Sequence, residues 1–487
     1  MKAHPPKAGR ALLGVCVLAS ATIGGLARAQ DLDTASFHDA AIEALGGRDA
    51  DSLAYTGAGW DACLGQAWSV EEGWARWELT DYRRAIDYAR GTSSQTAMRR
   101  PGLDPERIGG CGAQPDGAAR PQASSIGAGA AWPEQLPIWL TPHGFAKLIA
   151  AGDAEIANER RGWQVTLPLT RDGVEYVLVG RYNRDFELSS ITTWVDNTVF
   201  GDMEVLAEFG AYRDFGEVSF PESLSISEGG FPTLSLVIDG AELGVEVAAG
   251  DSARRGLPSA AEGAPWTEIG DGIFAFHGAY QSVAVEFDRF LVVIDGLQSD
   301  ARVRELIGLV KEAIPDKPIR YVVNTHSHFD HASGLRQFAA EGAVILTHAR
   351  NVSFFEQALS TPRTLRRDPI EPSEVPVQVQ GIDGRFVISD GSGQLVELYP
   401  LRPSAHAADM VVVYLPSIKA IVEADVLQPW INPVFGGDDG PHPFLVYLHE
   451  ELERAGIDYE RFVPIHAPPE PPTMDASALE DVLEGHL

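Results

Sequence analysis

The sequence predicts an α/β fold for residues 264–487 and, before it, an α+β domain with an antiparallel sheet over residues 30–250. Two observations carry this prediction. After residue 290, short β-branched runs alternate with helical patterns, and ionisable side chains stand where the runs end. From Trp163 onward, short runs of alternating apolar and polar residues are separated by turn-forming residues. Residues 251–263 are expected to form the linker.

The first 29 residues predict a secretory signal peptide. Three basic residues precede an apolar stretch from Ala11 to Leu26, and Ala27-Arg28-Ala29 offers a small-residue cleavage site. A transmembrane anchor is the alternative, but the stretch is short and interrupted by glycines. We therefore expect a periplasmic or secreted protein with no membrane insertion after cleavage. Two cysteines would remain, Cys63 and Cys111, and whether they pair is open.

The amino-terminal domain is expected to begin with a short helix and to continue through a long loop into strands. Residues 36–45 and 138–151 have helical patterns, the latter starting around Thr141-Pro142, and residues 99–131 are rich in glycine, proline and alanine and indicate a loop. Successive strands are predicted at residues 163–169, 174–182, 188–195, 203–209, 217–220 and 233–238.

This combination of sheet and helices weakly resembles the lipoprotein-carrier half-barrels of bacterial envelopes. Such a sheet would bind an apolar ligand or simply cover the catalytic domain. The half contains no ligand cluster, phosphate loop or nucleophile motif.

In the carboxy-terminal domain, buried strands are predicted at residues 290–294, 319–323, 411–415, 420–423 and 462–465. Helices are predicted at residues 300–313, 334–340, 351–359 and 444–455. Open α/β sheets build their sites at the carboxyl ends of strands. The residues that follow these strands are therefore the candidates for chemistry.

The segment His326-Ser-His328-Phe-Asp330-His331 directly follows the strand at residues 319–323. Imidazole and carboxylate are ligands of a borderline-soft divalent ion such as Zn²⁺, and no structural role calls for so many of them together. In a turn, His326 and His328 can face one metal while Asp330 and His331 face another. The segment therefore predicts a site for two metals.

This spacing resembles the signature of the metallo-β-lactamase superfamily, His-x-His-x-Asp-His. The resemblance extends in order through Asp295, His406, Asp425 and His466, each placed at a strand end, and covers residues 264–487. It implies an αββα sandwich, in which helices cover both outer faces of two packed sheets and the metals lie at one edge.

The resemblance also implies the role of each residue. A first metal would be held by His326, His328 and His406, and a second by Asp330, His331 and His466. Asp425 and a water or hydroxide would bridge the pair. Asp330 would also be catalytic, orienting the hydroxide, and Asp295 would hold the histidine turn from outside the ligand shell. Two Zn²⁺ ions are expected, with iron or manganese as alternatives.

The function implied is that of an exported, dinuclear zinc hydrolase attacking an ester, a lactone or a related bond. Lactonase-like and thioesterase-like members carry the bridging aspartate, whereas true β-lactamases of the superfamily generally lack it, so Asp425 favours a lactone or ester over the alternative of a β-lactam. Two other classes stay open: an iron-containing redox member, which usually has an added flavin domain, and a non-catalytic envelope binding protein.

The net charge of the chain limits which kinds of partner it can bind. The formal net charge is −31, and loss of the signal would leave 34 basic against 69 acidic residues, or −35. Such a surface repels nucleic acid, so we expect a small-molecule substrate and no nucleic-acid partner. The oligomeric state stays undetermined by the sequence.

Four further histidines and one loop are expected to lie outside the metal-ligand set. His348 is expected to be structural, and His277, His442 and His449 are left between cleft and surface. Residues 428–443 combine apolar area with glycines, which is typical of a substrate-gating loop, although an ordinary surface loop is nearly as consistent with the pattern.

Overall fold

The computed structural model describes residues 32–47, 50–102, 118–248, 265–278, 280–295, 299–370, 376–427, 443–466 and 472–483. The expected signal peptide, the linker at 251–263 and nearly all of the expected gating loop lie outside these residues, as do Cys16, Cys111 and His442. Among the described helices, none combines the length and apolar character needed to cross a membrane.

The amino-terminal part is built on one antiparallel sheet of eleven strands, in the order β4-β3-β2-β1-β13-β12-β9-β8-β7-β6-β5. Its strands are β1 (Ser52–Ala67), β2 (Trp74–Asp87), β3 (Thr92–Pro101), β4 (Arg120–Ile126), β5 (Glu155–Glu159), β6 (Gly162–Arg171), β7 (Val174–Tyr182), β8 (Leu188–Asn197), β9 (Gly201–Phe209), β12 (Ser223–Glu228) and β13 (Phe231–Leu243). A separate hairpin joins β10 (Tyr212–Phe215) to β11 (Val218–Pro221).

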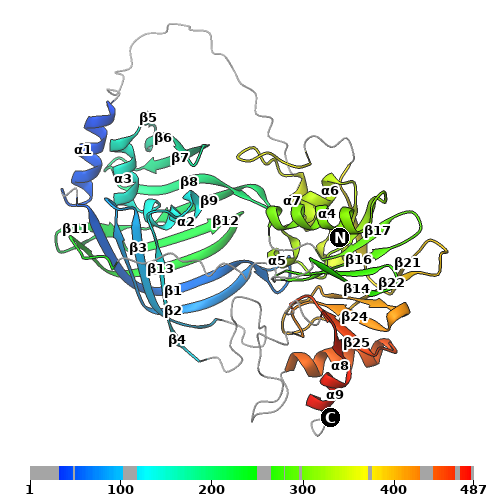
Figure 1. The fold of residues 1–487 in the computed structure, drawn as a ribbon. Coiled ribbons are helices and arrows are strands. Elements are labelled where there is room, and N and C mark those ends of the chain that lie inside the picture. The colour runs from blue at the N-terminus through cyan, green and yellow to red at the C-terminus, as the bar shows by residue number, and fades with distance from the viewer. Residues whose placement is uncertain are drawn as a thin grey trace, which may run out of the picture.

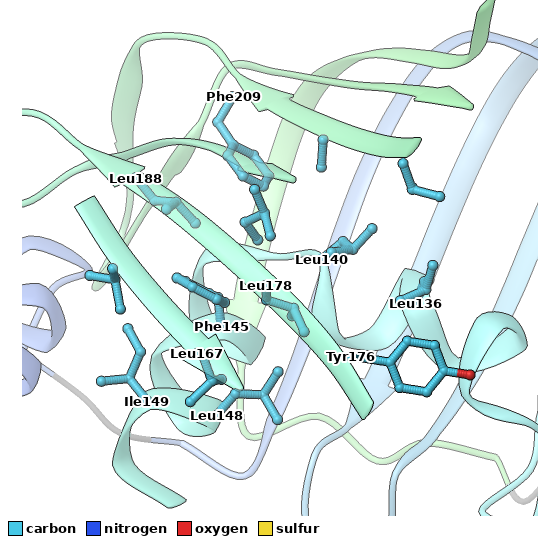
Figure 2. Packing of buried hydrophobic residues seen from close by; sticks show 14 of the residues in the cluster. Leu136, Leu140, Phe145, Leu148, Ile149, Leu167, Tyr176, Leu178, Leu188 and Phe209 are labelled. Atoms are coloured by element: carbon cyan, nitrogen blue, oxygen red, sulfur yellow. The ribbon is translucent and has the colours of Figure 1, made fainter. Parts of the chain in front are cut away.

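Three helices pack against this sheet: α1 (Thr34–Ala44), α2 (Trp132–Trp139) and α3 (Pro142–Ala151). Alternation along β6 to β9 turns one face of each strand toward the helices. Figure 2 shows the result: Phe145 and Leu148 of α3 lie against Leu167 and Leu178 of the strands. The expected α+β domain with an antiparallel sheet is confirmed.

Two predictions for this part were wrong. Residues 99–131 are not one loop, because β3 extends to Pro101 and β4 occupies residues 120–126. The long strands β1 and β2 were missed because β1 carries small residues where a strand usually carries bulky ones. A Cβ at Gly59 would come within 1.9 Å of the Ser235 carbonyl oxygen, so close contact with β13 requires glycine there.

The carboxy-terminal part contains two sheets. The first has the order β14-β15-β16-β17-β18-β19-β20 and the second β21-β22-β23-β24-β25-β26. The first comprises β14 (Trp266–Gly270), β15 (Ile273–Phe276), β16 (Ser282–Glu286), β17 (Leu291–Ile294), β18 (Ile319–Val323), β19 (Val344–His348) and β20 (Gln378–Ile382). The second comprises β21 (Phe386–Ser389), β22 (Leu395–Pro400), β23 (Val411–Leu415), β24 (Ala420–Glu423), β25 (Arg461–Pro464) and β26 (Met474–Asp475).

These sheets pack face to face, with helices outside both. Val285 and Ile294 of the first sheet share a buried core with Val413 and Val422 of the second. The outer face of the first sheet is covered by α4 (Asp300–Ala313), α6 (Leu335–Ala340) and α7 (Val352–Ser360), and that of the second by α8 (Pro443–Ala455) and α9 (Ser477–Leu483). The short α5 (Phe329–Ala332) carries part of the histidine segment. The expected αββα sandwich is confirmed.

Several contacts join the two parts, and the first centres on a buried arginine. Arg363 is almost fully buried. Its guanidinium binds Asp196 of the amino-terminal sheet at 2.5 Å and Asp300 of α4 at 2.5 Å. In the second contact, the β1–β2 hairpin runs from the large sheet toward α5 (Figure 1). Near the hairpin's end, Cys63 is disulfide-bonded.

Candidate metal centre

The candidate residues converge because all but one follow strands that end at the same edge of the sandwich. Asp295 follows β17, the histidine segment follows β18, Asp425 follows β24, and His466 follows β25. The loop before β23 supplies His406. All seven predicted ligands are brought together, and all are buried except Asp330, which is half-buried.

Side chains outside the ligand set fix the turn after β18. The amide of Asn324 donates to the carbonyl oxygens of His326 at 2.6 Å and His331 at 2.9 Å, which ties the two ends of the segment together. The backbone N–H of Ser327 donates to Asp409 over 2.9 Å. These buried bonds replace the helix or strand ladder that the turn lacks.

Asp295 determines which nitrogen of two histidines faces the centre. Its Oδ2 accepts from His331 Nδ1 at 2.7 Å and from the Thr325 hydroxyl at 2.9 Å. Because the Thr325 hydrogen is used in this way, Thr325 Oγ1 accepts from His326 Nδ1 at 3.2 Å. The Nε2 atoms of His326 and His331 are therefore the ring nitrogens that face the centre.

His328 is held in the opposite tautomer. Its Nε2 lies 3.0 Å from the carbonyl oxygen of Ala67, which can only accept, so Nε2 carries the proton. Its Nδ1 is buried 3.9 Å from Asp425 Oδ2 and has no hydrogen-bond partner within the described part of the chain. A buried ring nitrogen without a hydrogen bond has its lone pair available to a metal ion.

Asp425 lies at the middle of the cluster, with each carboxylate oxygen directed at a different group of histidines. Oδ1 lies 2.9 Å from His331 Nε2 and 2.5 Å from His466 Nε2. Oδ2 lies 3.0 Å from His406 Nε2 and 3.4 Å from His326 Nε2. One carboxylate thus faces two nitrogen sets.

The second set also shows facing nitrogens. His331 Nε2 and His466 Nε2 are 3.0 Å apart, although Nδ1 of His331 already donates to Asp295. Asp330 Oδ2 lies 3.5 Å from the same His331 nitrogen. Lone pairs converging at such distances require a cation between them, either a proton or a metal ion.

The charges of the cluster depend on one another. Burial alone would raise the pKa of Asp330 and of Asp425, but neighbouring histidines, His331 first for Asp330 and His466 first for Asp425, hold both pKa values below their usual range. Burial, followed by His331 and His328, lowers the pKa of His326. For His331 burial acts in the same direction, but the charges of Asp425 and Asp295 outweigh it and raise the pKa, so a metal ion at this nitrogen would replace a proton. Carboxylates kept ionised beside a neutral imidazole form the donor set that a divalent cation prefers.

Two overlapping groups therefore fit a metal ion each. The first is His326, His328, His406 and Asp425, and the second is Asp330, His331, His466 and Asp425. Within each group, the donor atoms lie within 4.8 Å of one another. Their chemistry, nitrogen with carboxylate oxygen, suits Zn²⁺ and also iron or manganese.

Sequence reasoning missed the residues around the ligands. The ring of Tyr280 stacks on His466 with centroids 3.9 Å apart, and its hydroxyl donates to Asp330 Oδ2 at 3.1 Å. Gln66 of β1 donates to Asp330 Oδ1 at 2.7 Å. Asp409 lies three residues after His406 and could have been noticed, whereas nothing near Gln66 in the sequence points to a partner 264 positions away.

Three further histidines within the described residues lie apart from both groups. His277 is buried at the end of β15, where Nε2 contacts the Thr267 hydroxyl at 2.8 Å, so neither the cleft nor the surface describes its position. His348 ends β19 and accepts from the Arg350 N–H at 3.2 Å, consistent with the structural role expected of it. His449 is half-buried on α8.

Comparison with known proteins agrees with this geometry. Residues 277–466 match the family model described as the metallo-beta-lactamase superfamily. The match begins at the end of β15 and ends at His466, so it spans all the candidate ligands. It confirms the resemblance noted for the carboxy-terminal half.

One curated relative and two solved structures illustrate the range of similarity. The 2,4-dinitroanisole O-demethylase subunit alpha of Nocardioides sp. (strain JS1661) is 23% identical over 206 residues, 42% of this chain and 55% of that protein. The chain thus spans about half the length of this relative. A metallo-beta-lactamase from Pontibacter korlensis is 20% identical, with 45% of this chain and 98% of that one covered and a TM-score of 0.34. The metallo-beta-lactamase FIM-1 from Pseudomonas aeruginosa, in its mono-zinc form, is 18% identical, with 45% and 92% covered and a TM-score of 0.33.

Proposed function

Because residues 277–466 match the metallo-beta-lactamase superfamily, we propose that this protein is an exported, dinuclear zinc hydrolase that cleaves a lactone or ester of a small molecule. The superfamily match and the two ligand groups support metal-dependent hydrolysis.

The observation that carries the proposal is the position of Asp425. Its Oδ1 faces His331 and His466 while its Oδ2 faces His406 and His326. A carboxylate with one oxygen toward each of two ligand sets is arranged to bridge two cations. The positive φ of Asp425, 68°, aims the side chain at this point, and aspartate tolerates that conformation better than most residues.

When bound, two zinc ions supply Lewis acidity toward the substrate and a water nucleophile that is active near neutral pH. The chain's contribution is orientation. Asp330 stands at the open side of the cluster, where it is a quarter exposed while His331 is fully buried. It is therefore the carboxylate within reach of an incoming substrate, and it can accept a proton from a water placed beside it.

The bridging aspartate favours a lactone or ester over a β-lactam, following the resemblance described above. A second candidate comes from the O-demethylase subunit, whose name describes removal of an O-linked methyl group from 2,4-dinitroanisole. An activated aryl ether is thus the second substrate class to test. Both classes present an electrophilic carbon and an oxygen leaving group, which the same centre would serve.

Export is supported by two features. The amino-terminal sequence has the charge, apolar stretch and cleavage site of a secretory signal. Cys63 is disulfide-bonded, which suits an oxidising compartment. The strongly acidic composition supports a small-molecule substrate, because it disfavours nucleic acid.

A substrate panel tests the proposal. Zinc-loaded protein would be assayed against lactones, aryl esters, a β-lactam, a sulfate ester and 2,4-dinitroanisole, with Asp330→Asn as the matched inactive variant. We expect lactone or ester turnover that Asp330→Asn lowers at least about 100-fold. Turnover of the β-lactam alone, or turnover that Asp330→Asn leaves intact, would contradict the proposal. In the protein as purified, before zinc is added, bound iron with a visible absorbance would favour a redox member. The absence of any bound metal would favour a binding protein.

A further inference from the structure

We propose that the tip of the β1–β2 hairpin, residues Gly65–Trp68, is a built part of the metal centre, and that Gln66 is its main positioning residue. The inference rests on the proposed metal site and adds to it a role for the amino-terminal part. Four consecutive residues of β1 and its turn contact two ligand-bearing segments, the histidine segment and the loop of His406, which lie more than 260 positions later in the chain.

The contact between Gln66 and Asp330 divides the work of the carboxylate. Oδ1 accepts from Gln66 Nε2 at 2.7 Å, and a carboxylate can only accept, so the amide nitrogen is the atom facing it. Oδ2 is then the oxygen directed toward His331, 3.5 Å from Nε2, with the Tyr280 hydroxyl at 3.1 Å. Gln66 thereby leaves one defined oxygen for the cation.

The next residue acts on a different ligand. The carbonyl oxygen of Ala67 accepts from His328 Nε2 at 3.0 Å and so keeps the proton away from Nδ1, the nitrogen inside the cluster. Partners of this kind set the tautomer and ring orientation of metal-bound histidines. Here the partner belongs to the amino-terminal sheet.

Trp68 holds the loop of the third ligand. Its indole N–H donates to the Ser404 carbonyl at 2.8 Å, and its own carbonyl accepts from the Ala408 N–H at 2.7 Å. These two bonds lie on either side of His406. The loop that carries His406 is therefore fastened to the hairpin at both ends.

Gly65 allows the hairpin to lie this close. Its φ is +80°, and a Cβ there would come within 2.3 Å of Phe329 Cγ, next to His328 and Asp330. Both the backbone conformation and the lack of a side chain are needed. Contacts from 65 to 68 thus form one continuous support for the centre.

The test measures metal binding rather than turnover. In the full-length protein, zinc affinity is determined by chelator competition and the Co²⁺ form by its visible d–d spectrum. Gln66→Met keeps the length of the side chain and removes the donor, and Gln66→Glu replaces the donor by a repelling carboxylate. Thr56→Val is the control, because it removes a side-chain bond of the same strand, to Asp239 at 2.5 Å, far from the metal ligands.

We expect Gln66→Met to weaken one of the two metal equivalents about 10-fold and to alter the Co²⁺ spectrum, with Gln66→Glu weaker still and Thr56→Val like wild type. If Gln66→Met does not fold, Gln66→Asn serves, since its shortened amide cannot reach Asp330. Wild-type affinity and spectrum in folded Gln66 variants would overturn the inference while leaving the metal site intact. A wild-type protein that binds no metal would overturn the proposed function itself.

Discussion

Asp295 Oδ2 accepts a hydrogen bond of 2.7 Å from His331 Nδ1 and a second, of 2.9 Å, from the Thr325 hydroxyl. Through these two bonds one buried carboxylate sets the tautomers of His331 and His326. Asp295 also has a positive φ of 69°, which an asparagine tolerates equally well.

Asp295→Asn therefore changes charge and acceptor capacity with little backbone strain. The amide oxygen can take the place of Oδ2 and accept both bonds, but the negative charge that favours them is lost, so we expect zinc affinity to fall about 10-fold while the protein stays folded. Chelator competition measures the affinity and circular dichroism the fold. Unchanged affinity would show that the two hydrogen bonds suffice and that the charge of Asp295 does not contribute to metal binding.

Gly65→Ala is expected to disturb the contact between the hairpin and α5. The new methyl group would overlap Phe329, and the alanine backbone would have to adopt the left-handed conformation of Gly65. Together these effects cost about 2–3 kcal/mol. Urea unfolding measures this loss. Gly73→Ala, at a turn position where an added Cβ meets nothing within 4 Å, is the control and should change the free energy of unfolding by less than about 1 kcal/mol. Equal effects of the two substitutions would contradict a close-packed hairpin tip.

Arg363 joins the two parts of the chain through Asp196 and Asp300. Arg363→Met leaves two mostly buried carboxylates without their shared cation, so the free energy of unfolding should fall by about 3 kcal/mol. Arg366 also contacts Asp196, at 3.3 Å, but its side chain is 67% exposed. Arg366→Met should therefore cost less than about 1 kcal/mol, and similar losses in both variants would refute the buried role of Arg363.

Glu451 on α8 gives a pH dependence of stability. Burial would raise its pKa, but hydrogen bonds from the side chain of Arg454 and the backbone of Arg402 lower the pKa below its ordinary value. Because the pKa is lowered in the folded state, ionised Glu451 stabilises the fold fully at a pH above its pKa in the unfolded chain, about 4.3. This stability is lost as the pH falls through the folded-state pKa.

Glu451→Gln should accordingly lower the urea midpoint at pH 7, and the difference from wild type should shrink as pH falls below about 4. The measurement is made with chelator present, so that metal loss does not contribute. A difference that is constant from pH 7 to acid would mean that the carboxylate charge is irrelevant to its contacts.

The sequence predicted the carboxy-terminal half well because its signals are local. The strand at residues 319–323 and the helix at 300–313 are apolar patterns with clear ends, and the structure has β18 and α4 with the same bounds. Most ligands follow such strands within a few residues, whereas His406 lies in the loop before β23. The resemblance to the metallo-β-lactamase superfamily implied that His406, Asp425 and His466 join the histidine segment.

The contributions that escaped prediction depend on distant contacts. Gln66 lies in a strand of small residues whose glycines are explained only by β13 and Phe329. Ala67 acts through its backbone carbonyl, which no residue pattern marks. Tyr280 is a single aromatic residue after a short strand, and only the assembled fold brings it onto His466.

The most direct test of the central claim is the zinc stoichiometry of the purified, zinc-replete protein, measured by native mass spectrometry for wild type and for Asp425→Ala. We expect two zinc ions per wild-type chain and fewer than two in the variant, because each oxygen of Asp425 faces a different ligand set. A single zinc in wild type, or two zinc ions retained with unchanged affinity in Asp425→Ala, would contradict a dinuclear centre bridged by this carboxylate.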